Sequence, residues 1–363
     1  MKAGIVGLPN VGKSTLFNCL SNAKAQSANF PFCTIEPNIG IINVPDSRLE
    51  KLEQLVNPEK LVPATVEIVD IAGLVKGASK GEGLGNQFLA NIRETDAIIH
   101  VIRCFDDDNI VHVEGSVDPV RDKEIIDLEL QLKDLETVEK KHEKLNRLVK
   151  TGNKEALKES VVLNKIIDHL RSFNSVRSLD FLDDEKKFAD SIQLITSKPI
   201  LYVCNVDESS VINGNQYVEN LKLSLNDKNA ELMILAIGTE ADINELDSYE
   251  DRKAFLLDIG LSEPGSSKLI KKAYSLLSLQ TYFTAGIKEV RAWTIKKGMT
   301  APKAAGVIHS DFEKGFIRAE VISYDNYIYY GSESKAREAG KLNVEGKEYV
   351  LIDGDIMHFR FNV

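Results

Sequence analysis

Residues 2–15 read KAGIVGLPNVGKST, and this stretch decides the fold. Lys2–Val6 is predicted to be a short apolar strand, and Leu16 and Leu20 then recur at helical spacing. Between them, Gly7–Ser14 matches GxxxxGK[ST], whose glycines let backbone N–H groups surround phosphate at a helix N-terminus. A strand, this loop and a helix, in that order, predict a nucleotide-binding P-loop.

Each residue type in the loop has a predicted role. The Lys13 ammonium is expected to reach the β- and γ-phosphates and to act in catalysis, and the Ser14 hydroxyl to bind Mg²⁺. The Asn10 side-chain carbonyl has two interpretations that the sequence leaves open: a ligand for K⁺ beside the phosphates, or a residue that only shapes the loop. The predicted phosphate-binding residues are Asn10, Val11, Gly12, Lys13, Ser14 and Thr15.

Two further motifs follow in the order that a nucleotide switch needs. The strand Val66–Asp70 ends in an acid, and from Asp70 the chain reads DxxG as far as Gly73. In this motif the Asp holds Mg²⁺ and the Gly amide senses the γ-phosphate during hydrolysis. Thr34, in the proline-bounded loop Phe30–Pro37, is the candidate ligand of Mg²⁺ and γ-phosphate.

The base-reading motif departs from the NKxD of GTPases. After the strand Pro199–Cys204 the chain reads NVDE, so that Glu208 stands where the motif has Asp. The Asp accepts hydrogen bonds from guanine, and one extra methylene misplaces the carboxylate. Asn205, the Val206 backbone and Glu208 are therefore predicted to read adenine, and ATP is the predicted substrate. A strained guanine site is the alternative.

Water activation departs from the GTPase pattern as well. Leu74 occupies the position of the glutamine that orients the attacking water, so slow hydrolysis is expected. His112, which follows the strand Ala97–Ile102, is the candidate replacement because an imidazole can orient water. From the sequence alone, a purely structural histidine is the competing interpretation.

Alternating strands and helices predict an α/β fold, a GTPase-like doubly wound sheet. Apolar residues recur every three or four positions from Arg121 to Lys150, with Leu128 and Leu132 among them, and again from Leu157, which predicts an inserted antiparallel coiled-coil hairpin. Between residues 140 and 171 the chain has nine Lys or Arg against four acids. This excess suits a contact with RNA phosphate, or only a solvated helical face.

Three domains are predicted from this organisation: a P-loop nucleotide-binding domain (1–120 and 199–278), the hairpin (121–198) and a C-terminal β-grasp module (279–363). In the module, Lys288–Ile295 is predicted as the first strand and Ala301–Ile308 as the start of a helix. Two further strands are predicted there, Tyr349–Ile352 and Ile356–Phe361.

Composition narrows the function classes. The 363 residues are 43% hydrophobic and 28% charged, as in a soluble globular protein, and no apolar run approaches the ~20 residues that span a bilayer. The net charge of −10 excludes a general attraction to nucleic acid or anionic lipid. The P-loop begins directly after the first strand, so no signal peptide is expected, and four scattered cysteines indicate a reducing cytoplasm rather than a zinc site.

The chain resembles the YchF subfamily of the Obg-like ATPases. The resemblance implies a slow ATPase that associates with the ribosome (the 50S subunit and the 70S particle) and regulates translation or a stress response. It also implies that His112 is the catalytic histidine, that K⁺ stimulates through Asn10, and that the C-terminal module is a ubiquitin-like TGS domain. The matching segments are Gly7–Thr15, Asn29–Pro37, Asp70–Gly85, Asn205–Glu208, Leu279–Gly286 and Asp311–Arg318.

Three functions remain open from the sequence. The first is an ATPase whose nucleotide state changes how the hairpin and the C-terminal module engage a ribosome. The second is a GTPase that acts as a translation factor. The third is a nucleotide-gated binding module in which hydrolysis is incidental.

Overall fold

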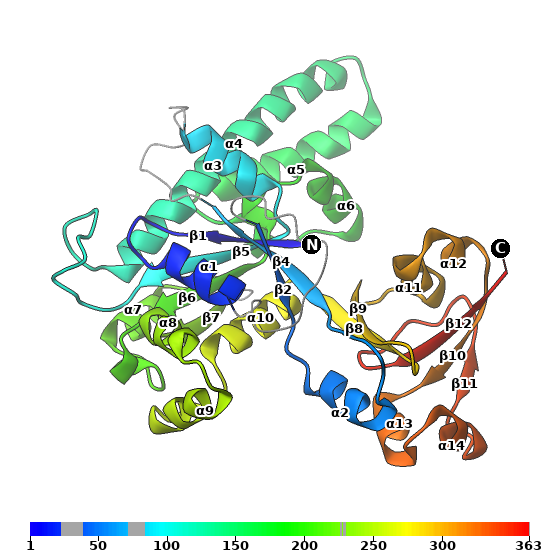
Figure 1. Ribbon diagram of the computed structural model, residues 1–363. Helices are drawn as coiled ribbons and strands as arrows, with labels where there is room; N and C mark the ends of the chain where they lie inside the picture. Colours follow the sequence, from blue (N-terminus) through cyan, green and yellow to red (C-terminus); the bar gives the residue numbers. More distant parts are fainter. Residues whose placement is uncertain (23–38, 72–83, 226, 228–229, 363) are drawn as a thin grey trace. The chain divides into compact units, whose positions relative to one another are not determined.

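The computed structural model describes residues 1–22, 39–71, 84–225, 227 and 230–362 (Figure 1). The chain forms two compact units. Unit 1 comprises Met1–Gly40 and Glu67–Leu269, and unit 2 comprises Ile41–Val66 and Ile270–Val363.

A six-stranded sheet carries the P-loop. Its strand order is β2-β4-β1-β5-β6-β7, and β1 is hydrogen-bonded in parallel to β4 and β5, as β6 is to β5 and β7. β5 and β6 are buried along their whole length, as expected for parallel strands with both faces covered. The strands are β1 (Lys2–Val6), β2 (Ile39–Asn43), β4 (Thr65–Asp70), β5 (Ala97–Arg103), β6 (Ile200–Asn205) and β7 (Glu231–Leu235). The predicted doubly wound α/β fold is confirmed.

Helices connect these parallel strands. Leu16 and Leu20, the apolar residues that predicted the first helix, are fully buried. The helices of unit 1 outside the hairpin are α1 (Lys13–Asn22), α3 (Leu84–Arg93), α7 (Gln216–Ser224), α8 (Ile237–Glu245) and α9 (Tyr249–Asp258), and α10 (Gly265–Leu276) begins in unit 1 and ends in unit 2. Three short 3-10 turns are η2 (Val176–Ser178), η3 (Ile195–Ser197) and η4 (Glu208–Ser210). In the described part of the chain, no helix is both long and apolar enough to cross a membrane.

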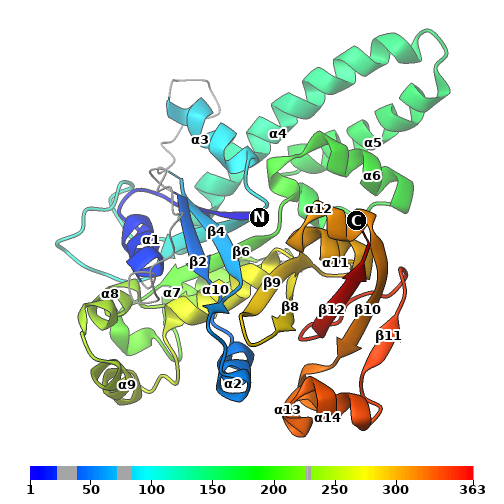
Figure 2. The ribbon, with the colours of Figure 1, turned by 45° about the vertical axis from the view of Figure 1, so that its right-hand side comes forward.

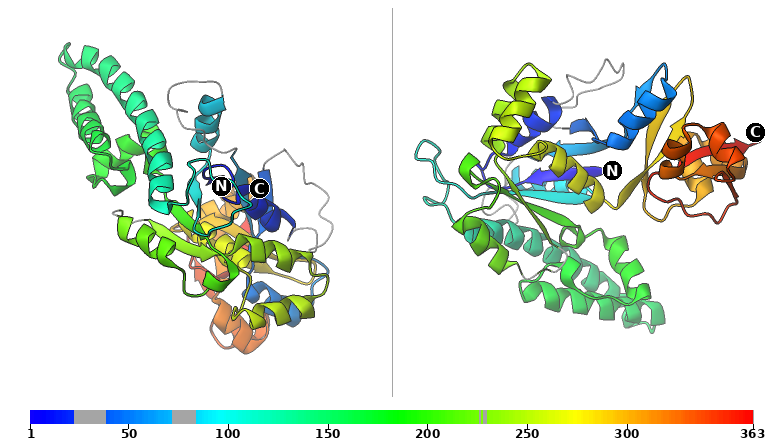
Figure 3. Two further views of the ribbon diagram at one scale, coloured as in Figure 1. Left: turned by 90° about the vertical axis from the view of Figure 1, so that its left-hand side faces the viewer. Right: turned by 90° about the horizontal axis from the view of Figure 1, so that it is seen from below.

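The predicted helical hairpin is present. α4 (Pro119–Val149) and α5 (Lys154–Arg171) lie side by side and project from the sheet of unit 1, with α6 (Asp183–Ile192) beside α5 (Figures 2 and 3). Asp118 caps α4 by accepting a hydrogen bond from the Arg121 N–H, and Asn153 caps α5. Residues that share the apolar seam are Val138, Leu145, Leu163, Ile166 and Leu170.

Part of the predicted apolar stripe faces outward. Leu128 and Leu132 are 39% and 40% exposed, and Leu157 is 53% exposed. The first half of α4 instead buries polar residues, among them Asp134, whose carboxylate accepts hydrogen bonds from the Ile195 N–H and from Thr196. The helical spacing is correct, but the buried face in this half of α4 combines Ile126 and Leu130 with polar residues, and Leu128 and Leu132 lie outside it.

Unit 2 contains a second six-stranded sheet, with the order β11-β10-β12-β8-β9-β3. β8 and β12 are central and parallel, and β9 and β10 flank them antiparallel, which is the β-grasp arrangement. α11 (Ala301–Ile308) covers one face, where Ala301, Ala304 and Ala305 are fully buried. The strands are β3 (Leu61–Val62), β8 (Leu279–Ala285), β9 (Val290–Lys296), β10 (Phe316–Ile322), β11 (Asn343–Glu345) and β12 (Ile356–Phe361), and the other helices are α2 (Ser47–Val56), α12 (Ser310–Lys314), α13 (Tyr324–Tyr330) and α14 (Glu333–Glu338).

Two predictions for this module are wrong. Lys288–Ile295 is not the first strand of the module, because β8 precedes it and pairs with it as a hairpin. Tyr349–Ile352 is not a strand: only Val350 bridges Thr300, and the two flanking hydrogen bonds join Tyr349 to Ala301 and Leu351 to Met299 at the start of α11. The predicted helix start at Ala301 and the strand Ile356–Phe361 are confirmed.

Residues 41–66 belong to unit 2, although the sequence analysis assigned them to the nucleotide-binding domain. Arg48, at the start of α2, forms ion pairs of 2.8 Å with Asp46 and 2.7 Å with Asp353. Its guanidinium also lies 5.2 Å from the centre of the Phe283 ring on β8. The contacts of Arg48 with Asp353 and Phe283 join residues more than 200 positions apart, which no local pattern indicates.

A buried histidine in β5 makes the stability of unit 1 sensitive to acid. His100 is 1% exposed, lies beside Tyr202 and has no hydrogen-bond partner for Nδ1 among the described residues. Burial lowers its pKa to about 4, and the nearby Asp127 carboxylate offsets only part of that shift. Between pH 6.5 and 4, His100 is therefore protonated in the unfolded chain but stays neutral in the folded chain.

We expect His100→Leu to flatten the pH dependence of the free energy of unfolding. Stability that is present above pH 6.5 is lost as the pH falls towards 4, by about 3 kcal/mol for this one group. Denaturant unfolding at pH 7 and pH 4.5 measures the difference. His309→Asn, at a histidine whose side chain is 61% exposed, is the matched control and should keep the slope of the unchanged protein. An unaltered slope in His100→Leu would contradict the assignment.

Candidate functional site

The P-loop leads from β1 to α1 through a left-handed turn. Asn10 and Gly12 have φ values of 62° and 100°, a region that Asn tolerates and Gly adopts freely. A Cβ on Gly12 would lie 2.8 Å from Asn205 Nδ2, so a side chain there would displace the Asn205 amide at the end of β6. The loop therefore needs Gly12 both for its turn and for its contact with β6.

The Lys13 side chain is buried within the P-loop. Its side chain is 8% exposed, and Nζ donates a 2.7 Å hydrogen bond to the Leu8 carbonyl. Burial lowers the pKa of Lys13, and the charge of Asp70 opposes that change. The ammonium is thus positioned over the loop, where it can interact with phosphate oxygens.

Ser14 and Asp70 converge as predicted for metal ligands. The Ser14 hydroxyl donates to Asp70 Oδ2 at 3.3 Å. Asp70 Oδ1 is buried and makes no hydrogen bond among the described residues, and a buried carboxylate oxygen of this kind is a suitable ligand for a hard cation. The other two predicted residues of this part, Thr34 and Gly73, lie outside the described residues, as does Leu74.

A pocket of about 440 Å³ lies beside the P-loop. All three predicted base-reading residues line it, and Asn10, Gly12 and Thr15 form its phosphate side. Its remaining lining residues, none of which is among the predicted site residues, are Phe105, Asp107, Ile110, Asp207, Ile237, Gly238 and Thr239.

Asn205 braces this pocket. Its Nδ2 donates a 3.0 Å hydrogen bond to the Val11 carbonyl, and its Oδ1 accepts one of 3.1 Å from the Ile237 N–H. The side chain is 4% exposed and joins the P-loop to the start of α8. Its predicted contact with the base stays a prediction, since both polar atoms already have protein partners.

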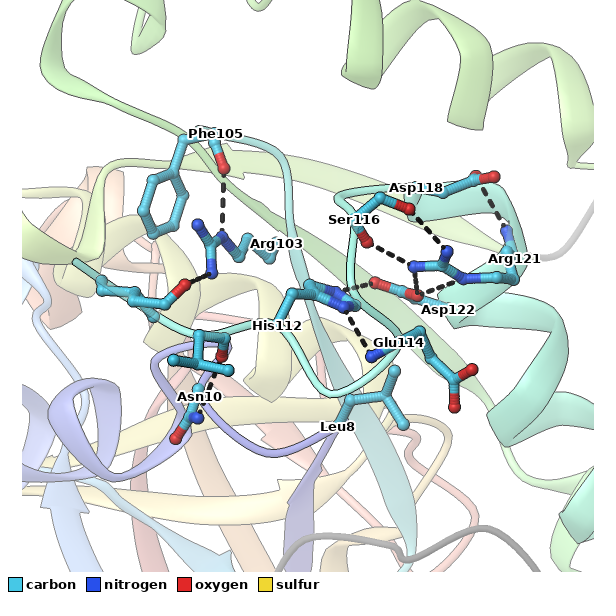
Figure 4. A network of polar contacts seen from close by, with 12 residues as sticks. Leu8, Asn10, Arg103, Phe105, His112, Glu114, Ser116, Asp118, Arg121 and Asp122 are labelled. Atoms are coloured by element: carbon cyan, nitrogen blue, oxygen red, sulfur yellow. Dashed lines mark hydrogen bonds and ion pairs between the residues drawn. The ribbon is translucent and has the colours of Figure 1, made fainter. Parts of the chain in front are cut away.

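Arg103 organises the loop between β5 and α4. It is 2% exposed, and its guanidinium donates to the carbonyls of Phe105, Asp107 and Ile110 at 2.8–3.1 Å. Figure 4 shows the bond to the Phe105 carbonyl. It also lies 4.8 Å from the centre of the Phe105 ring. The position of Arg103 at the end of a buried strand was the only signal in the sequence that could have identified it.

His112 lies in the middle of the same loop, and both of its ring nitrogens are hydrogen-bonded (Figure 4). Nδ1 accepts from the Glu114 N–H at 3.1 Å, and Nε2 lies 2.8 Å from Asp122 Oδ2 on α4. The P-loop contacts the preceding residue, because Asn10 Nδ2 donates to the Val111 carbonyl at 3.1 Å. The segment of His112 therefore adjoins the phosphate loop, and its catalytic role stays a prediction.

The fold and this site together define a P-loop NTPase of the GTPase type. A family model described as 50S ribosome-binding GTPase matches residues 2–165, and the model YchF-GTPase_C, described as a protein of unknown function, matches 279–362.

Relatives match over the full length. "Ribosome-binding ATPase YchF" of Bacillus subtilis (strain 168) is 54% identical, with all of both chains covered, and that of Escherichia coli O157:H7 is 52% identical over all of this chain and 99% of the other. A solved structure, "Structure of the Schizosaccharomyces pombe YchF GTPase", is 39% identical with a TM-score of 0.91, covering 99% of this chain and 97% of that one. The chain belongs to the YchF family.

We expect Arg103→Met to loosen the loop that lines the pocket. The three loop carbonyls lose a charged hydrogen-bond donor, and each such bond contributes roughly 1.5–3 kcal/mol. We therefore expect the free energy of unfolding to fall by at least about 2 kcal/mol. Amides of residues 105–110 should exchange faster, and nucleotide affinity should fall. The measurements are denaturant unfolding, hydrogen exchange and nucleotide titration.

Arg171→Met is the matched control for this change. The Arg171 side chain is 60% exposed and pairs only with Glu139 at 2.7 Å, so its loss should change stability by less than about 0.5 kcal/mol. Unchanged amide exchange in Arg103→Met would show that the loop holds its conformation without the guanidinium.

Proposed function

We propose that this chain is a slow, Mg²⁺-dependent ATPase that binds the ribosome and regulates translation or a stress response according to its bound nucleotide. The observation that carries the proposal is the pocket that joins the P-loop to the NVDE segment. The names of the full-length relatives support both the ATPase and the ribosome assignments. A ribosomal partner also favours the cytoplasm as the place of action.

The phosphates would lie over the loop from Asn10 to Thr15. Lys13 supplies the positive charge, and Ser14 and Asp70 would hold Mg²⁺, with Thr34 as a further ligand and the Gly73 amide at the γ-phosphate. The orphaned Asp70 oxygen supports this metal site. Mg²⁺ would neutralise charge on the phosphate oxygens. Asn10 Oδ1 is the oxygen that we assign to K⁺, since Nδ2 is engaged by Val111.

The base side favours adenine. The Val206 N–H donates to the Leu235 carbonyl, so a backbone contact from Val206 to a base can come only from its carbonyl, a hydrogen-bond acceptor. An acceptor suits the N6 amino group of adenine and repels O6 of guanine. Asp207 is engaged as the cap of η4, where hydrogen bonds from Ser209 and Ser210 lower its pKa. Of the two acids in the motif, Glu208 is therefore the one that we assign to the base.

The base preference is the part that most needs an experiment, because the relatives are named ATPases whereas the fission yeast structure is titled a GTPase. We expect this protein to bind ATP more tightly than GTP, and Glu208→Asp to move the ratio towards GTP by about tenfold or more. Titration of both nucleotides with Mg²⁺ measures the ratio.

Glu219→Asp controls for shortening a glutamate elsewhere in the same unit. Its side chain is 52% exposed and pairs with Lys222 on α7, so the ratio should stay as in the unchanged protein. If the unchanged protein binds GTP more tightly than ATP, the proposal that it is an ATPase is rejected in favour of a GTPase.

The tip of the hairpin is the surface that we assign to the ribosome, through RNA phosphate of the 50S subunit or the 70S particle. Among the described residues, five exposed basic side chains there form no ion pair: Lys144, Arg147, Lys150, Lys154 and Lys158. Three others in the basic segment are already paired, Lys140 with Glu136, Lys165 with Glu185 and Arg171 with Glu139. The charge excess is therefore concentrated at the tip.

We expect the triple change Lys144→Ala, Arg147→Ala, Lys150→Ala to weaken co-sedimentation with ribosomes and to reduce its salt dependence. Each lost phosphate contact lowers the slope of log affinity against log salt by roughly 0.7–0.9. The triple change Lys140→Ala, Lys165→Ala, Arg171→Ala removes the same charge from paired positions and should have the smaller effect. Equal losses in both variants would rule out the tip as the contact.

A further inference from the structure

The hydrogen bonds of His112 fix its tautomer. A backbone N–H can only donate, so Nδ1, which faces the Glu114 N–H, must be the unprotonated nitrogen of the neutral ring. Nε2 then carries the proton and donates it to Asp122 Oδ2 at 2.8 Å. The carboxylate thereby selects Nδ1 as the basic nitrogen of His112.

Asp122 is a rigid partner. Its side chain is 3% exposed, and Oδ1 accepts two hydrogen bonds from Arg121, at 3.1 Å from Nε and 2.8 Å from Nη2. Arg121 is in turn tied to the hydroxyl and the carbonyl of Ser116 (Figure 4). Both carboxylate oxygens are thus held, one by the imidazole and one by the guanidinium.

The bond on the other side of the ring is weaker. The Glu114 N–H is a neutral donor at 3.1 Å, in a loop where Val111 and Val113 are 76% and 49% exposed. Gly115 has a φ of 79° and no atom within 4 Å of the place where a Cβ would lie. A charge-assisted bond to a buried carboxylate is about twice as strong as a neutral bond, so the Glu114 contact breaks first when this loop moves.

We propose that Asp122 is a positioning residue for hydrolysis. It keeps the proton of His112 on Nε2, and Nδ1 accepts a hydrogen bond from the attacking water once the Glu114 N–H turns away. The proposal rests on the catalytic role proposed for His112 and adds the residue that determines which of its nitrogens faces the water. In hydrolases with a Ser-His-Asp triad, the aspartate likewise holds the catalytic histidine in one tautomer and orientation.

The location of Asp122 connects this positioning to the hairpin. It is the fourth residue of α4, whose 31 residues extend about 46 Å towards the basic tip. A partner that displaces α4 would move the carboxylate and the imidazole together. Hydrolysis thereby becomes sensitive to what is bound at the hairpin.

The test is Asp122→Asn in the full-length protein. An amide can present its NH₂ group to Nε2, which moves the proton to Nδ1 and removes the acceptor for water. We expect kcat for ATP to fall about 100-fold with KM and the affinity for a non-hydrolysable ATP analogue nearly unchanged. Asp122→Glu, which keeps a carboxylate, should recover part of the rate. Unchanged or faster turnover in Asp122→Asn would overturn the proposal.

Asp118→Ala separates positioning from support of the helix. Asp118 caps α4 one turn earlier and does not contact His112, so its loss destabilises the same helix end and should leave kcat intact. An equal loss of kcat in Asp118→Ala would assign the effect to the helix end and reject the positioning role.

The double variant His112→Ala, Asp122→Asn distinguishes the role of Asp122 from that of His112. If Asp122 acts through His112, adding Asp122→Asn to His112→Ala causes no further loss of kcat. Full turnover in His112→Ala would reject the proposed catalytic histidine itself. Loss in His112→Ala with normal turnover in Asp122→Asn would reject only the role of Asp122.

Discussion

One side-chain amide, that of Asn205, determines how the phosphate and base parts of the pocket are joined. It donates to the Val11 carbonyl and accepts from the Ile237 N–H, so three segments that lie far apart in the sequence share one residue. Gly12 is required by the same contact, because a Cβ there would lie 2.8 Å from the amide nitrogen. The Asn205 amide is therefore needed to hold the pocket together, and this role does not depend on which base binds there.

A second set of contacts links the nucleotide site to the hairpin. Arg103 holds the loop carbonyls from Phe105 to Ile110, and His112 connects the middle of that loop to Asp122 on α4. The P-loop joins this network through the contact of Asn10 with the Val111 carbonyl. A series of polar contacts, exposed at Asn10 and buried at Arg103 and Asp122, therefore leads from the P-loop to the first turn of the hairpin.

Local pattern predicted the elements of unit 1 well and those of unit 2 less well. The strand Lys2–Val6 and the hairpin follow from apolar spacing and caps, which act over a few residues. In the β-grasp module, Tyr349–Ile352 has strand-like residues but makes a single bridge to Thr300, because the chain opposite turns into α11 at Ala301. Strand pairing is settled by partners distant in the chain, which a local pattern does not contain.

The sequence by itself predicted the P-loop, the convergence of Ser14 and Asp70 as candidate metal ligands, and the altered base motif, because the chemistry of phosphate and base binding requires those residue types at that spacing. Only the tertiary structure decided that Asn205 is a brace, that 41–66 joins the C-terminal unit, and that His112 is bonded to Asp122. The physical reason is that each of these depends on a hydrogen bond or packing contact between segments whose proximity arises from the folded sheet and not from the chain.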